Sequence, residues 1–193
     1  IPVAPVPPSS TDPMSRYLSH ALGAIVLFAA GLVAQGPTLL KDINPTGLPN
    51  ESSSPRRFAD LGTVTLFNAR TEDHGAELWR TDGTTAGTVL VADIATGTPD
   101  SSPEDLVVLG NRVLFTADDQ IHGRELWITD GTASGTMLLA DIEPGPNSSG
   151  PRDLIEMAGR VYLLASEQVH GREPWITDGT TAGTQLLKDI KIG

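Results

Sequence analysis

The chain has 193 residues, enough for one ordinary domain or for a section of a repeat array. Its 13 basic and 24 acidic residues give a net charge of −11 with no Lys/Arg cluster, which argues against nucleic acid as a partner because phosphates would be repelled. Cysteine is absent, so disulfides, thiolate metal sites and cysteine nucleophiles are excluded.

The first part of the chain has the pattern of an export signal. Residues 1–13 form a Pro-rich leader that does not begin with Met, so we interpret Met14 as the true start; a fragment boundary is the other explanation. Arg16 then precedes an apolar run at 21–34, which is shorter than the ~20 residues that a membrane-spanning helix needs. We predict a cleaved signal peptide at 14–34 rather than a buried helix. A secreted or cell-surface protein with no membrane span after cleavage follows from this prediction.

Residues 35–193 are dominated by a tandem repeat. The motif ELWRTDGTTAGT begins at Glu77 and returns as ELWITDGTASGT at Glu125 and as EPWITDGTTAGT at Glu173, so that successive copies lie 48 residues apart. Alignment on this motif divides the chain into units 38–88, 89–136 and 137–184, followed by a partial unit 185–193. The first unit is longer because it carries three extra residues in a loop, where insertions cost little.

Each unit is expected to form four short β-strands. In the second unit the strand-like runs are 105–109, 112–117, 125–129 and 136–142. Gly110-Asn111 suits a tight reversal between the first two runs. Asp130-Gly131 supplies the positive φ angles that a hairpin between the last two runs requires. The DGTxxGT stretch is therefore predicted to be a hairpin loop.

Apolar residues occupy both faces of these runs. In 125–129, Leu126 and Ile128 point to one face and Trp127 points to the other. Burial on both faces is typical of stacked sheets, and four strands in a period of ~40–50 residues are typical of β-propeller blades. We therefore predict an all-β chain, a β-propeller-like array of about three four-stranded blades. A helical solenoid is excluded because no run shows a 3.6-residue period, and β-helix coils are shorter.

The predicted array is too short to close, since propellers usually have ~4–8 blades. It begins with a leading strand at 38–43 and ends with the counterpart of that strand at 185–190. We predict an open fragment of a larger propeller, with an apolar face exposed at each end and further blades C-terminal to residue 193. Sedimentation of this chain as a compact, stable monomer would count against missing blades.

The three twelve-residue motifs, each followed by a strand ending in Asp-Ile, resemble the bacterial ELWxxDGT repeat family, also called hyalin-repeat-like. The resemblance covers residues 38–193. It implies secreted or surface-exposed multi-repeat proteins with propeller-like architecture and no established catalytic activity, and it brings no catalytic residues. The chain departs from the pattern at Pro174, at Ala76, which is Arg in the other units, and in its DIKIG ending. Because proline lacks an N–H, the third strand of unit 137–184 is expected to start at Trp175 or to contain a bulge.

The repeated histidines and glutamates are candidates for metal binding as well as for structure. The His-x-x-Glu pattern occurs at His74 and Glu77, at His122 and Glu125, and at His170 and Glu173. Two ligands per unit are too few for a zinc or copper site, and each pair would lie on a different blade. We predict a structural hydrogen bond from each His to strand or loop backbone, similar to the network of WD repeats.

The turn residues and the tryptophans also have two interpretations. The turns are Asp82-Gly83, Asp130-Gly131 and Asp178-Gly179, and the tryptophans are Trp79, Trp127 and Trp175. No DxDxDG run or loop Glu accompanies the aspartates, so we predict that they cap their turns, with calcium binding as the minority alternative. Exposed tryptophans would stack on sugar rings, but their place inside the third strand predicts packing between blades.

Loops that differ between units are the better candidates for a ligand surface. The acidic positions before the histidines are Asp73, Asp118 and Asp119, with Ser166-Glu167 in the third unit. A plain solvated loop is the alternative interpretation of these residues. No GxSxG, P-loop or HExxH motif occurs in the chain.

The sequence thus favours a non-enzymatic, secreted or cell-surface scaffold for adhesion or for interaction with an extracellular protein or polysaccharide. We expect no cofactor, calcium being the exception left open, and no nucleic-acid partner. One alternative is the propeller part of an extracellular hydrolase or lyase, in which Tyr162 and the variable acidic loops would face the central channel. The other is a calcium-stabilised repeat adhesin.

Overall fold

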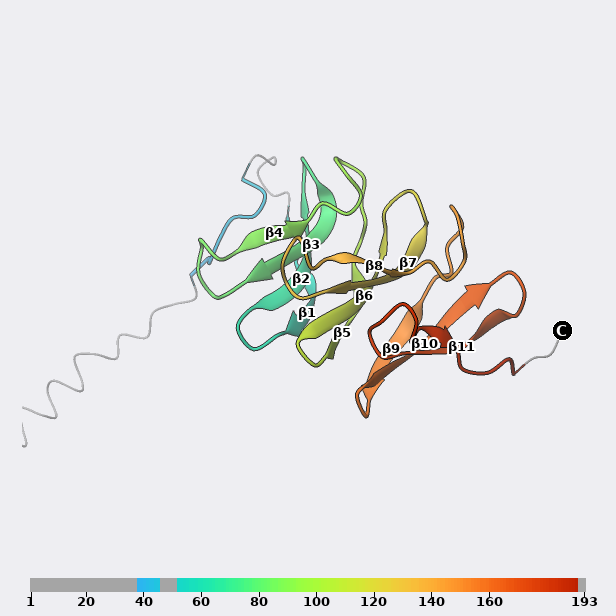
Figure 1. Ribbon diagram of the computed structural model, residues 1–193. Helices are drawn as coiled ribbons and strands as arrows, with labels where there is room; N and C mark the ends of the chain where they lie inside the picture. Colours follow the sequence, from blue (N-terminus) through green and yellow to red (C-terminus); the bar gives the residue numbers. More distant parts are fainter. Residues whose placement is uncertain (1–37, 46–51, 191–193) are drawn as a thin grey trace, which may run out of the picture. The chain divides into compact units, whose positions relative to one another are not determined.

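The computed structural model describes residues 38–45 and 52–190, and within them the chain is all-β (Figure 1). The described residues form twelve strands in three four-stranded antiparallel sheets and contain no helix. The described residues include no helix that is long and apolar enough to cross a membrane. The strands belong to a compact unit at Leu40–Gly193. The predicted leader at 1–13 and signal peptide at 14–34 lie outside the described residues.

Each sheet is a simple meander in which strands adjacent in the chain are hydrogen-bonded neighbours. Sheet 1 contains β1 (Arg56–Asp60), β2 (Thr65–Thr71), β3 (Gly75–Thr81) and β4 (Val89–Ala92). Sheet 2 contains β5 (Glu104–Leu109), β6 (Arg112–Asp118), β7 (Arg124–Thr129) and β8 (Met137–Ala140). Sheet 3 contains β9 (Arg152–Met157), β10 (Arg160–Glu167), β11 (Gly171–Thr177) and β12 (Gln185–Leu186).

The strands predicted for the second unit coincide with β5 to β8, with small differences at their ends. The largest difference is at β8, which ends at Ala140 although the apolar pattern continues to Ile142. The chain turns at this point because Asp141 Oδ2 accepts a hydrogen bond from Gly145 N (3.2 Å). Side-chain capping therefore ends the strand before its apolar pattern does.

The predicted leading strand at 38–43 is wrong, because these residues form no strand. Its counterparts β4, β8 and β12 each pair with the third strand of their own sheet, which comes before them in the chain. No such strand precedes 38–43 among the described residues. The segment is instead held on sheet 1 by side chains: Thr85 Oγ1 donates to Leu40 O (2.8 Å) and Lys41 Nζ donates to Thr88 O (2.7 Å).

The strand interruption predicted at Pro174 is also wrong. Pro174 lies inside β11, which pairs with β10 in a continuous register that places Leu164 opposite the proline. Its counterparts Leu78 and Leu126 lie where the fourth strand of their sheets shifts register against the third. This edge of the third strand is thus irregular in the other sheets, and an irregular edge tolerates a residue without an N–H.

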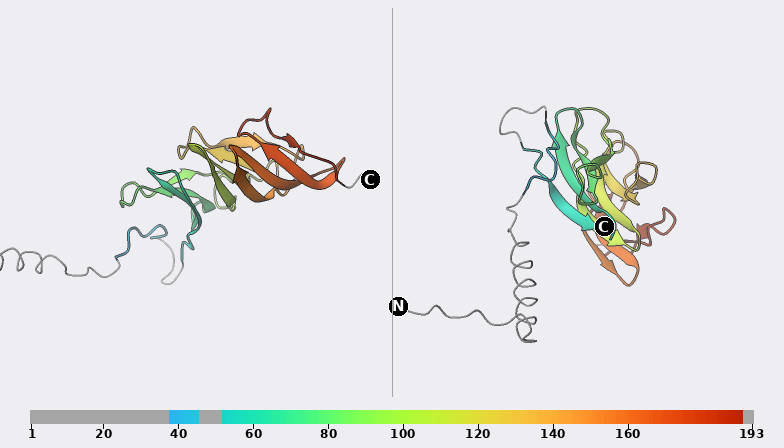
Figure 2. Two further views of the ribbon diagram at one scale, coloured as in Figure 1. Left: turned by 90° about the horizontal axis from the view of Figure 1, so that it is seen from below. Right: turned by 90° about the vertical axis from the view of Figure 1, so that its left-hand side faces the viewer.

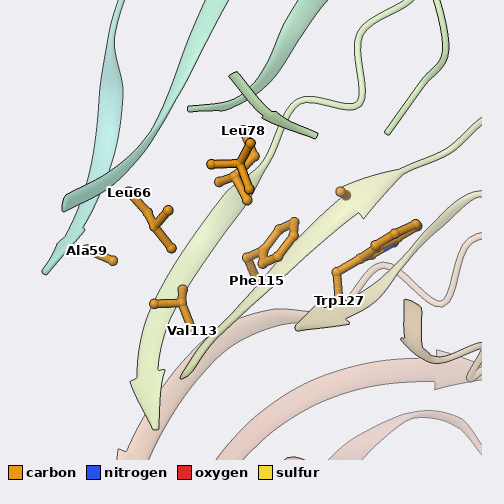
Figure 3. Close-up of a cluster of buried hydrophobic side chains, with 8 residues drawn as sticks. Ala59, Leu66, Leu78, Val113, Phe115 and Trp127 are labelled. Atoms are coloured by element: carbon orange, nitrogen blue, oxygen red, sulfur yellow. The ribbon is translucent and has the colours of Figure 1, made fainter. Parts of the chain in front are cut away.

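The three sheets pack against one another in chain order (Figures 1 and 2), with β1 beside β5 and β5 beside β9. The core between sheets 1 and 2 contains the buried side chains of Leu66, Leu78, Val113, Phe115 and Trp127 (Figure 3). The core between sheets 2 and 3 contains the buried side chains of Leu114, Leu126, Ile128, Val161 and Leu163. Sheet 2 is therefore covered on both faces.

We call the face of sheet 2 that is directed toward sheet 3 its forward face, and the face directed toward sheet 1 its back face. The equivalent repeat positions define the forward and back faces of sheets 1 and 3. In β5 the residues alternate between these faces: Leu106 packs against the core shared with sheet 1, and Val107 against the core shared with sheet 3. Because the repeat is regular, Ala59 and Leu154 take the corresponding forward and back positions in their sheets. This explains the apolar residues on both faces of the predicted strands.

Candidate functional site

The DG turns are closed by their own side chains. Asp130 Oδ1 accepts hydrogen bonds from Thr132 N (2.9 Å) and Thr132 Oγ1 (2.6 Å), and Thr132 Oγ1 accepts one from Gly135 N (3.0 Å). The side-chain bond from Thr132 and then its backbone bond lower the pKa of the Asp130 carboxyl. The same bonds recur at Asp82 and Asp178. Each aspartate therefore caps its turn, as the sequence predicted.

The glycines of the second and third DG turns, Gly131 and Gly179, lie against the preceding sheet. A methyl group placed on Gly179 would lie 3.1 Å from Leu109 Cδ2, and one placed on Gly131 would lie 3.5 Å from Leu61 Cδ1. A methyl group on Gly83 would meet nothing within 4 Å, because no sheet precedes sheet 1 in the described residues. The DG turn thus combines a positive φ angle with packing between sheets.

The buried glutamate of the motif joins each sheet to the connection that leads to the next one. Glu125 is fully buried, and its carboxylate accepts hydrogen bonds from Ile142 N (2.9 Å), Ser149 N (2.6 Å) and Ser149 Oγ (2.6 Å). Burial raises the pKa of the Glu125 carboxyl, and the bonds from Ser149 and Ile142 oppose this rise. Three donors from one connection therefore converge on a single carboxylate.

Glu77 makes the same arrangement one unit earlier. Its carboxylate accepts from Ile94 N (2.9 Å), Ala95 N (3.3 Å), Ser101 N (3.0 Å) and Ser101 Oγ (2.5 Å). Sequence reasoning missed the serines. A signal for them exists, since Ser101 and Ser149 each follow the motif glutamate of the preceding copy by 24 residues. In the third unit Glu173 Oε2 accepts from Ile190 N (3.0 Å).

The histidines bind carboxylates rather than the backbone groups that we predicted. His122 Nδ1 lies 2.7 Å from Asp119 Oδ2, and His170 Nδ1 pairs with Glu167 in the same way. The first unit has Thr71 at this position, and His74 Nδ1 bonds instead to Asp93 Oδ2 (3.1 Å). The prediction was wrong because the acceptor lies on a variable loop position, which a search for repeated residues does not reveal.

The His-x-x-Glu pattern does not bring its two side chains to one site. In the second unit the imidazole binds Asp119 while the Glu125 carboxylate is occupied by the connection that follows β8. The hydrogen bond to Asp119 raises the pKa of His122, with burial acting in the opposite direction. Within 38–45 and 52–190, no three His, Cys, Asp or Glu side chains are grouped so that they could hold a metal ion.

The tryptophans pack inside the structure. Trp127 is 9% exposed and lies in the core between sheets 1 and 2, with its ring centroid 6.5 Å from that of Phe115. Trp175 packs against the core between sheets 2 and 3, and Trp79 lies with Phe67 in a cluster on the back face of sheet 1. Stacking of these rings on a sugar is therefore not their role in this structure.

The loops that precede the motif histidines differ between the units, and those of the second and third units carry an acidic residue at the base and an apolar residue at the tip. Asp119 Oδ1 accepts from Ile121 N (2.9 Å), and Glu167 Oε2 accepts from Val169 N (2.7 Å). Ile121 is 68% exposed and Val169 is 79% exposed, while the first unit has Asp73 at the same position. Asp119 and Glu167, which we considered as ligand contacts, thus shape their loops, and the tip is acidic in the first unit and apolar in the other two.

The chain matches no protein-family model, and no curated protein matches it. Its likeness to the ELWxxDGT repeat family therefore stays a prediction based on the motifs.

Two surface hollows lie beside the variable loops. The hollow at the β2–β3 loop has a polar lining of Asn44, Ser52, Arg70, Thr71 and Glu72. The hollow at the β10–β11 loop has a more apolar lining that includes Ile142, Pro144, Val169, Trp175 and Leu186. The two hollows therefore differ in chemistry although the loops stand at equivalent positions of the repeat.

Proposed function

We propose that this chain is a secreted or cell-surface scaffold that presents variable loops to an extracellular protein or polysaccharide and has no catalytic activity of its own. One observation carries the proposal. The side chains that repeat in every unit are used in contacts within and between the sheets, while the exposed loop tips differ from unit to unit. A scaffold with variable loops produces this division, because loops tolerate change where the packed elements do not.

The proposal includes membership of the ELWxxDGT repeat family and a propeller-like arrangement of the sheets as blades. Three features support it: the 48-residue spacing of the motif, the meander order of each sheet, and the stacking of the sheets face to face. In a propeller these sheets would be consecutive blades. Export by the signal peptide at 14–34 would place the scaffold outside the cell.

Binding is tested on immobilised panels of extracellular polysaccharides and matrix proteins. We expect the chain to bind at least one class, and the double variant I121S/V169S to bind roughly tenfold more weakly, because it removes the exposed apolar tips. Met137→Ser is the control, since Met137 is an exposed apolar residue outside the variable loops. Equal binding by the double variant would contradict the proposal, and release of fragments from a polysaccharide would support the hydrolase or lyase alternative.

The proposed scaffold does not depend on calcium. The turn aspartates Asp82, Asp130 and Asp178 each direct a carboxylate oxygen at the following threonine, which satisfies that oxygen without a cation. We expect calcium at about 1 mM to leave the melting temperature unchanged, because only a ligand that prefers the folded state raises it. If calcium raises the melting temperature and magnesium at equal ionic strength does not, the result would support the calcium-stabilised adhesin instead.

A further inference from the structure

The forward face of sheet 3 is uncovered in the described residues. On sheet 2 the forward positions Val107, Leu109, Leu139 and Ile142 pack in the core shared with sheet 3. Their counterparts on sheet 3 are exposed by 50% to 69%, and they are Ile155, Met157, Leu187 and Ile190. The same repeat positions are thus packed in one sheet and solvent-exposed in the last.

The back face of sheet 1 is incompletely covered. Phe58 is 62% exposed, whereas its counterparts Leu106 and Leu154 pack in the two cores between sheets. An apolar hollow on this face is lined by side chains that include Ile43, Phe58 and Phe67. The turn at Gly83 has open space where the other two DG turns contact a preceding sheet.

The structure itself shows what fits a forward face. The back face of sheet 2 covers the forward face of sheet 1, and the back face of sheet 3 covers that of sheet 2, through equivalent residues. We propose that two copies of this chain associate head to tail, with the forward face of sheet 3 of one copy on the back face of sheet 1 of the other. Met157 of one copy then meets Gly83 of the second, as Leu109 meets Gly179 within the chain.

One segment has to move in this arrangement. Residues 39–43 and 186–190 have the same sequence, LLKDI, and take equivalent positions of the repeat. Thr85 Oγ1 donates to Leu40 O (2.8 Å) just as Thr181 Oγ1 donates to Leu139 O (2.9 Å), so the leading segment stands where the fourth strand of a preceding sheet would stand. When two copies dock, the leading segment (39–43) of one copy and the trailing segment (186–190) of the other would occupy the same position, which has room for only one of them.

The leading segment is the one that leaves. The trailing segment continues from β12, which pairs with β11, and it is held further by the bonds from Leu187 N to Pro174 O (2.9 Å) and from Ile190 N to Glu173 Oε2 (3.0 Å). The leading segment has no strand pairing and is held by side-chain bonds and by the packing of Ile43. Displacement therefore exchanges weaker contacts of one copy for equivalent contacts made by the other.

The two faces differ, so the contact is heterologous and leaves one free face at each end of a dimer. Sedimentation velocity of the full chain should therefore show species larger than a dimer as concentration rises. The net charge of −11 opposes association, and the experiment uses about 0.15 M salt so that the repulsion is screened. A chain that stays monomeric up to about 1 mM, the weak end of measurable affinity, would overturn the proposal.

Single-face variants give the sharper test. Met157→Asp and Phe58→Asp should each be monomeric alone, while an equal mixture should form dimers and nothing larger, because each variant keeps one competent face. Met137→Asp is the control: Met137 is 52% exposed, similar to Met157 at 57%, but it lies in sheet 2, and its counterpart in sheet 3 is the polar Gln185. The control should associate as the parent chain does.

The remaining outcomes also decide the proposal. Dimers of Met157→Asp alone or of Phe58→Asp alone would overturn it, as would a mixture that stays monomeric. Thermal melts verify that each variant is folded, and Ile155→Asp replaces Met157→Asp on the same face if the latter is not. Ile43→Ser loosens the leading segment and should strengthen association several-fold, whereas unchanged or weaker association would overturn the displacement of this segment.

Discussion

Replacement of Trp127 by Ala should lower the free energy of unfolding by about 3–5 kcal/mol, the range found for truncation of buried aromatic side chains. The indole lies between sheets 1 and 2 and contacts both the Phe115 ring and the core that includes Leu78 (Figure 3). Its removal leaves a cavity that the flanking strands cannot fill, because they are held by ladder hydrogen bonds on both sides. The loss therefore includes packing as well as transfer of the ring to water.

Urea denaturation followed by circular dichroism measures this loss, and Ile121→Ala serves as the matched control. Ile121 is an apolar residue at an exposed loop tip, and its truncation should change the free energy of unfolding by no more than about 0.5 kcal/mol. Near-parental stability of Trp127→Ala would show that the ring is not a core residue. It would also remove the reason to assign the repeated tryptophans to packing.

Glu125→Ala should destabilise the chain by about 3 kcal/mol, because a fully buried acceptor is lost and its donors remain buried. Ile142 N, Ser149 N and Ser149 Oγ would all lack an acceptor inside the structure. Glu125→Gln keeps the shape and one carbonyl oxygen, so it should cost less than Ala. Ser149→Ala removes one donor together with its need for an acceptor and should be the mildest of the three variants.

The pH dependence of stability separates the glutamate from its glutamine variant. Burial raises the pKa of Glu125 in the folded chain above its value in the unfolded chain, even though its hydrogen bonds act in the other direction. The protonated folded form is therefore favoured: this contribution to stability is complete below the unfolded pKa of about 4.3 and is lost as the pH rises through the raised folded pKa. Burial likewise raises the pKa of Glu77.

Denaturation at a series of pH values from about 4 upward measures this effect. Glu125→Gln should show a smaller loss of stability across this window than the parent chain, since glutamine does not titrate. The slope that remains comes partly from Glu77. An equal slope in both chains would contradict the raised pKa of Glu125 and leave only its hydrogen bonds as an account of its role.

Much of the fold could be predicted from the local sequence, because side-chain alternation and turn formation depend on neighbouring residues. Alternation around Trp127 indicated which faces are buried, and Asp130-Gly131 indicated the hairpin that the structure shows between β7 and β8. The leading segment, which we predicted to be a strand, does not form one, although its sequence LLKDI recurs at 186–190. A strand needs a hydrogen-bonding partner, and no local pattern reveals whether one is present.

By itself the sequence determined the repeat, its strands, its turns and the burial of its tryptophans, since each follows from side-chain alternation or from turn chemistry within a few residues. Only the tertiary structure decided which groups the buried glutamates and the histidines bind. Glu125 bonds to Ser149, 24 residues away, and His74 turns to Asp93 because Thr71 replaces the acid that the other units provide. These pairings depend on how one sheet is seated on the next, and that seating is set by packing across distances that local periodicity does not encode.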